Sequence, residues 1–90
     1  MADAKSLAVS VVAADHEVWS GEARQIVART TEGEIGILAG HEPLLAILAA
    51  GEVRVNASTG ERLVARADDG FLSVENDTVT IVARDAELIK

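Results

Sequence analysis

The sequence contains no cysteine, a single proline and only two aromatic side chains, Trp19 and Phe71. The absence of cysteine excludes disulfides and thiolate metal sites. The scarcity of aromatic rings argues against a sugar or peptide site built on exposed rings. Apolar residues nevertheless make up 49% of the chain, and most are alanine, valine, isoleucine and leucine. A core of small, branched side chains favours β-strands.

Positive charge is also scarce, because the chain has 8 basic residues and 15 acidic ones, which gives a net charge of −7. This balance argues against nucleic acid and anionic lipid as partners, since both are bound by clustered lysine and arginine. Many acidic residues fall in expected turns, where they would attract a basic partner or simply confer solubility. The first 19 residues lack the pattern of a secretory signal, and their apolar run is too short to span a bilayer. We therefore expect no direct insertion into a membrane.

A chain of 90 residues predicts one domain with a single core. Apolar residues alternate with polar ones in most of the sequence, which indicates strands with one buried face. The expected inward-facing residues are Leu7, Val9, Val11, Val53, Val55, Leu63, Ala65, Ala67, Leu72, Val74, Val79, Ile81 and Ala83.

Clusters of turn-forming residues separate these runs, at 20–22, 32–34, 39–41, 50–52, 58–61, 68–70 and 75–77. Seven clusters predict eight to ten short strands, and hence an all-β sandwich or barrel. Residues 44–51 are ambiguous between a strand and a helical turn, with the strand favoured. The tail, residues 84–90, has the pattern of a first helical turn or a frayed end.

The glycine-rich stretch at 33–40 does not match a phosphate-binding loop. Gly33, Gly36 and Gly40 lack the spacing, the following lysine and the helix that such loops require. Acidic neighbours would also repel a phosphate. These glycines are better explained by turns that need positive φ or by closely packed backbones.

No catalytic or cofactor-binding constellation is found. His16 and His41 are each followed by a glutamate, but adjacent strand residues point to opposite faces and do not chelate one metal ion. Asp68 and Asp69 precede Gly70 and have the pattern of a hairpin turn, not of an acid/base pair. The serines lack a nucleophile motif. We expect no catalytic residue, no cofactor and no metal site. A small metal-dependent hydrolase using the two histidines and a stand-alone ligand-binding sandwich remain alternatives.

One ordered set of motifs does carry a resemblance. The stretch "EGEIGILAGHEPLLAIL" at 32–48 resembles the signature of the epsilon subunit of bacterial F-type ATP synthase. The segments "VWSGEARQIVART" at 18–30, "GEVRV" at 51–55 and "DDGFLSVENDTVTIVA" at 68–83 are similar to other segments of that family, in the same order. The resemblance covers residues 6–85, and the tryptophan in the first of these segments is similar to the actinobacterial branch.

This resemblance implies a flattened, ten-stranded β-sandwich over residues 1–85, with residues 86–90 beginning a C-terminal segment whose helical domain is missing. It implies a non-catalytic subunit of the central rotor stalk, which binds the gamma subunit and the membrane-embedded c-ring. The complex would also contain the alpha and beta catalytic subunits and couple proton flow to ATP synthesis. The expected location is the cytoplasmic side of the cell membrane, as a peripheral protein.

The resemblance also implies a loop that faces the c-ring. The matching residues in this chain are Glu32, Glu34, Gly40, His41 and Glu42. Two positions depart from the family pattern, since alanine replaces a usual proline at position 39 and aspartate replaces a common glycine at position 69. The leucines that follow the loop, Leu44, Leu45 and Leu48, are expected in the core, with a gamma contact as the alternative.

Overall fold

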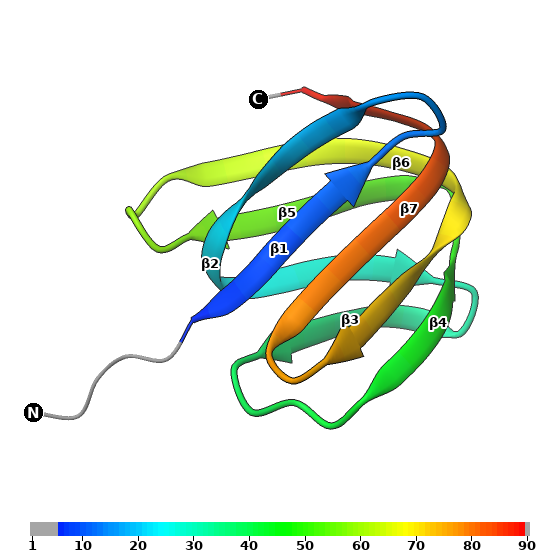
Figure 1. Ribbon diagram of the computed structural model, residues 1–90. Coiled ribbons are helices and arrows are strands. Elements are labelled where there is room, and N and C mark those ends of the chain that lie inside the picture. Colours follow the sequence, from blue (N-terminus) through cyan, green and yellow to red (C-terminus); the bar gives the residue numbers. More distant parts are fainter. Residues whose placement is uncertain (1–5, 90) are drawn as a thin grey trace, which may run out of the picture.

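The computed structural model describes residues 6–89, which form a sandwich of two β-layers (Figure 1). Among these residues no helix has the length and apolar character needed to cross a membrane. The strands are β1 (Leu7–Val12), β2 (Glu17–Thr30), β3 (Gly33–Leu38), β4 (Leu44–Leu48), β5 (Gly51–Ala57), β6 (Arg62–Glu75) and β7 (Thr78–Leu88).

Hydrogen bonds between strands define the two layers. The first layer contains β1, β4, the N-terminal parts of β2 and β7, and the C-terminal part of β6. The second layer contains β3, β5 and the remaining parts of β2, β6 and β7. All pairings are antiparallel except that of β1 with β7, which is parallel.

The expected count of ten strands is wrong for the described residues, which form seven. The difference arises because β2, β6 and β7 are long and each bends from one layer into the other, as Figure 1 shows for β6 and β7. Two expected turns, at 20–22 and 68–70, lie inside β2 and β6. The all-β sandwich is confirmed, whereas the barrel alternative is not confirmed.

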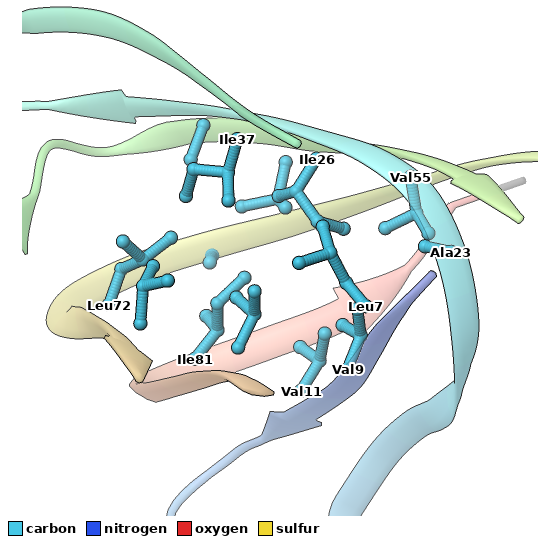
Figure 2. Packing of buried hydrophobic residues seen from close by; sticks show 14 of the residues in the cluster. Leu7, Val9, Val11, Ala23, Ile26, Ile37, Val55, Leu72 and Ile81 are labelled. Carbon is cyan, nitrogen blue, oxygen red and sulfur yellow. The ribbon is translucent and has the colours of Figure 1, made fainter. Parts of the chain in front are cut away.

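The core lies between the layers and follows the alternation of the sequence. The large side chains with under 2% exposure are Leu7, Ile26, Ile37, Leu72, Ile81, Val11, Val53, Val74 and Val79. Figure 2 shows Ile26 and Ile37 of the second layer projecting toward Leu72 and Ile81 of the first. All of the inward-facing positions predicted from the alternation are buried, because a period of two places every second side chain on the same face.

Strand β6 bends at Asp69 and Gly70. Asp69 has a φ of 61°, which is uncommon for a residue with a Cβ. Gly70 lies directly against β7, where a Cβ atom would come within 1.9 Å of the Val82 carbonyl oxygen. The two aspartates therefore belong to a bend within a continuous strand, and the predicted hairpin turn is wrong.

Two further expectations need correction, on the leucines that follow the β3–β4 connection and on the tail. Leu45 is 71% exposed, and of the three leucines expected in the core only Leu48 is fully buried. Phe71 is 45% exposed and Trp19 is half-buried, so neither aromatic ring is enclosed in the core. The tail is not helical, because β7 continues to Leu88 and Ile89 donates a backbone hydrogen bond to Val64.

Candidate partner-binding surfaces

The segment 39–43 connects β3 to β4 and contains three of the predicted site residues. Gly40 has a φ of 88°, as expected for a glycine that a turn requires. Its backbone N–H donates a hydrogen bond of 2.7 Å to Oδ1 of Asp77. His41 donates from its backbone to the Leu38 carbonyl, and its Nδ1 lies 2.7 Å from the carbonyl oxygen of Glu42. Gly40 and Glu42 are exposed, whereas His41 is half-buried.

The other two predicted residues, Glu32 and Glu34, lie where β2 turns into β3. Thr30 holds this turn, because its hydroxyl accepts a hydrogen bond from the Glu32 backbone and donates one to the Gly33 carbonyl. Gly33 has a φ of 120°, which accounts for a glycine at this position. Both glutamates are exposed, and Glu34 lies opposite Arg29 in the strand register.

The five predicted residues therefore form two groups and not one. Strand β3 has six residues and separates them, with Glu32 and Glu34 at its start and Gly40, His41 and Glu42 beyond its end. At roughly 3.3 Å per residue, the two groups are about 20 Å apart along the strand. We name them the β2–β3 acidic turn (Glu32 and Glu34) and the β3–β4 loop (Gly40, His41 and Glu42).

Neither histidine joins a cluster of ligands. Nδ1 of His16 lies 2.7 Å from Oδ1 of Asp15 at an exposed position. This hydrogen bond, and then the charge of the imidazolium, lowers the pKa of the Asp15 carboxyl. Within residues 6–89 no group of three histidine, aspartate or glutamate side chains is arranged to hold a metal ion. The predicted residues of this part of the chain are therefore considered as surfaces for contact.

A third surface was touched by the sequence reasoning only through Leu45, for which a partner contact was the alternative to the core, and its other members were not predicted. Leu45 and Ile47 of β4 are 71% and 63% exposed, and Phe71 lies directly opposite Ile47 on β6. In the register of the strands, one row of outward-facing residues crosses the layer from Ile47 and Phe71, and the next row crosses it from Leu45. The residues that these two rows contain on β6, β7 and β1 are uncharged, and the first row then reaches Glu17 of β2. The uncharged neighbours are Ser73, Thr80, Val82, Ser10 and Val12. We call Leu45, Ile47 and Phe71 with these neighbours the apolar outer face.

The sequence contains a signal that could have revealed this face. Strand β4 reads "LLAIL", with an apolar residue at each of its five positions. Because successive side chains of a strand point to opposite faces, such a run places apolar residues on both of them. Leu48 points into the core, and Leu45 and Ile47 are left outside. Exposed apolar patches of this kind mark interaction surfaces.

A protein-family model, described as the β-sandwich domain of the ATP synthase delta/epsilon chain, matches residues 6–89. The ATP synthase epsilon chain of Streptomyces avermitilis is 48% identical over 85 residues, which cover 94% of this chain and 68% of that relative. The ATP synthase epsilon chain of Micrococcus luteus is 48% identical over 82 residues, which cover 91% of this chain and 90% of that relative.

Solved structures support the same relationship. A chain in the cryo-EM structure of the Euglena gracilis mitochondrial ATP synthase, which contains OSCP, F1 and the c-ring, superposes with a TM-score of 0.86 at 28% identity. The match covers 92% of this chain and 53% of that chain. A chain of the Tetrahymena thermophila central stalk and c-ring shares the fold, with a TM-score of 0.73 at 20% identity. The chain therefore belongs to the ATP synthase delta/epsilon chain family and carries its β-sandwich domain.

Proposed function

We propose that this domain is a non-catalytic subunit of the rotor stalk of an F-type ATP synthase and docks on the gamma subunit through the apolar outer face. The exposure of Leu45, Ile47 and Phe71 side by side is the observation that carries the proposal. Three large apolar side chains on adjacent strands lose contact with water when a partner covers them, which stabilises a complex. Among the described residues, the charged side chains that border this face lie at its ends, at Glu17 beside Val12, at Glu75 and at the Asp69–Arg84 ion pair.

The second contact of the proposal is with the c-ring. The β2–β3 acidic turn and the β3–β4 loop border the same strand, β3, which ends the sheet order and, within residues 6–89, pairs with β2 alone. Together they expose Glu32, Glu34 and Glu42, and none of these three glutamates forms an ion pair with another of the described residues. Acidic side chains at the rim of an interface favour basic loops of a partner and steer its approach. Two separated groups could bridge neighbouring copies of a ring subunit.

In this role the domain performs no chemical step. It transmits motion, so what it must supply is a rigid body with two contact regions. The continuous strands β2, β6 and β7 join the two layers covalently, which resists sliding of one layer on the other. Coupling proton flow to ATP synthesis on the alpha and beta subunits belongs to the assembled complex. The domain would be held peripherally at the cytoplasmic side of the cell membrane through its partners.

Calorimetric titration of the chain with the purified gamma subunit tests the gamma contact. We expect a one-to-one complex for the unaltered chain and at least tenfold weaker binding for the double variant Leu45→Ser, Ile47→Ser, because two central apolar contacts are lost. The matched control is Leu38→Ser, which alters a side chain of similar exposure (57%) in the second layer. The fluorescence of Trp19 and far-UV circular dichroism verify that each variant is folded. Equal affinity for all three proteins would contradict docking through the apolar outer face.

A further inference from the structure

One hydrogen bond joins two turns that are 37 residues apart in the sequence. The backbone N–H of Gly40, in the β3–β4 loop, donates to Oδ1 of Asp77 at 2.7 Å. Asp77 belongs to the turn between β6 and β7. A hydrogen bond to a carboxylate is stronger than one between neutral groups, and its short length agrees with that class.

The Asp77 end of this bond is held in place. Asn76 and Asp77 have φ values of 51° and 58°, the combination typical of a tight two-residue hairpin turn. Glu75 and Thr78 pair directly on either side of the turn. The Asp77 carbonyl also accepts a hydrogen bond of 2.8 Å from the backbone of Ala8, at the start of β1. The carboxylate is therefore presented from a backbone that is held by the pairing of β6 with β7 and by a hydrogen bond from β1.

The Gly40 end has fewer restraints of its own. Residues 39–43 form no strand pairing, and their other hydrogen bonds in the described structure are local, from His41 to Leu38 and between His41 and Glu42. Position 39 is an alanine, which does not restrict φ as a proline ring would. Gly40 itself has the widest range of backbone conformations of any residue type. A distant anchor consequently has a large effect on which conformation this loop adopts.

We propose that Asp77 is a positioning residue, whose carboxylate holds the β3–β4 loop in the conformation that presents His41 and Glu42 to a protein partner. This inference rests on the proposed function of that loop as a contact with the c-ring. Asp77 acts through Gly40 and need not touch the partner. A preordered loop binds more tightly, because less conformational freedom is lost on association.

Amide hydrogen exchange of the isolated chain tests the bond itself. The variant Asp77→Gly removes the carboxylate and keeps a residue that adopts positive φ easily. We expect the Gly40 amide to exchange at least fivefold faster, with the amides of Ile26 and Ile81 in the core unchanged. Asn76→Gly is the matched control, since it alters the same turn and leaves the carboxylate in place. Asp77→Asn retains an acceptor oxygen and should restore much of the protection. Unchanged exchange at Gly40 in Asp77→Gly would overturn the inference.

A binding measurement tests whether Asp77 affects the affinity for the partner or only the local conformation of the β3–β4 loop. The variants are added to ATP synthase from which the epsilon subunit has been removed, and the affinity of each for the complex is measured by co-sedimentation. We expect several-fold weaker binding for Asp77→Gly, near-normal binding for Asn76→Gly and Asp77→Asn, and unchanged binding of all three to isolated gamma. Normal affinity of Asp77→Gly despite fast exchange at Gly40 would overturn the positioning role.

The same assay can tell whether the positioning role of Asp77 fails or whether the proposed contact with the c-ring fails. The combined variant Glu32→Ala, Glu34→Ala, His41→Ala removes side chains of both surfaces that border β3. Normal affinity of that variant would reject the c-ring contact itself. Weak binding of the combined variant together with normal binding of Asp77→Gly would retain the contact and reject only the role of Asp77.

Discussion

Gly70 of β6 lies so close to Val82 of β7 that a Cβ at position 70 would come within 1.9 Å of the Val82 carbonyl oxygen and 2.5 Å of the Ala83 Cα. Both of these atoms belong to the backbone, so no side chain can move aside to make room. The close approach occurs at the point where β6 bends from the second layer into the first. A glycine is therefore required here for packing, even though its φ is not positive.

We predict that Gly70→Ala lowers the free energy of unfolding by about 3 kcal/mol, the upper part of the range for inserting atoms into a packed site. Urea denaturation followed by the fluorescence of Trp19 would measure this. Gly36→Ala is the control, because a Cβ there meets only the amide nitrogen of Gln25, at 3.8 Å. Its effect should stay within about 0.5 kcal/mol. Equal effects of the two substitutions would show that the backbones at Gly70 separate without cost.

The neighbouring residue Asp69 provides a second prediction, because its backbone is strained. A residue with a Cβ costs roughly 1–2 kcal/mol in the left-handed region, and a glycine avoids most of that cost. The Asp69 carboxylate lies 3.6 Å from Nη1 of Arg84, but both side chains are largely exposed, so this pair contributes under about 1 kcal/mol.

We therefore expect Asp69→Gly to have equal or slightly higher stability than the unaltered chain, and Asp69→Ala to be about 1 kcal/mol less stable than Asp69→Gly. Thermal unfolding of the three proteins decides this. Both substitutions remove the ion pair, so their difference isolates the backbone. Equal melting temperatures for the two variants would mean that φ at this position relaxes.

The pair Asp15 and His16 leads to a prediction about pH. The hydrogen bond from His16, followed by its charge, lowers the pKa of Asp15 in the folded chain. A carboxyl whose folded pKa is lowered stabilises the fold above its unfolded pKa, about 3.9, and loses this contribution as the pH falls through the folded value. His16→Ala should raise the pKa of Asp15 toward its usual range, as measured by NMR titration of the carboxyl carbon.

The effect of this pair on stability should be small, because both side chains are largely exposed and solvent screens them. The unaltered chain and His16→Ala should differ in melting temperature by little at any pH. The titration curve of Asp15 is thus the informative measurement. An unchanged pKa in His16→Ala would show that the hydrogen bond is not formed in solution.

The alternation of apolar residues was enough to predict the all-β class and the inward face of β1, β5, β6 and β7, including Leu72 and Val74. It could not predict the number of strands. Glycine beside small polar residues indicates a turn in local sequence, yet at Gly70 the same residues allow two backbones to approach within one continuous strand. The distinction depends on β7, which lies elsewhere in the sequence. Local patterns do not contain that information.

The candidate site, like the fold, was predicted only in part from the sequence. The family motif located the β3–β4 loop and the β2–β3 acidic turn, but their separation by β3 follows from the strand pairing. The bond from Gly40 to Asp77 joins residues 37 positions apart, and no local pattern predicts such a contact. Phe71 and Leu72 differ in burial because β6 has only one face toward the core, and the sequence alone left open whether the Phe71 ring is buried.

The last prediction uses this difference between adjacent residues. Leu72 is completely buried, and Leu72→Ala should lower the free energy of unfolding by about 2–5 kcal/mol. Phe71 is 45% exposed on the apolar outer face, so Phe71→Ala should cost only about 1 kcal/mol of stability. For binding to the gamma subunit we expect the reverse order. Phe71→Ala should weaken the complex at least tenfold, since large aromatic side chains at the centre of an interface carry much of its affinity.

Urea denaturation and calorimetric titration of both variants, carried out at a temperature where Leu72→Ala is still folded, measure the two quantities separately. A folded Leu72→Ala should bind gamma almost normally, because its side chain does not reach the surface. If Phe71→Ala bound gamma as tightly as the unaltered chain, the ring would lie outside the contact, and Leu45 and Ile47 alone would define the docking surface. If Phe71→Ala instead unfolded as readily as Leu72→Ala, the ring would pack against the domain itself and would be unavailable to a partner.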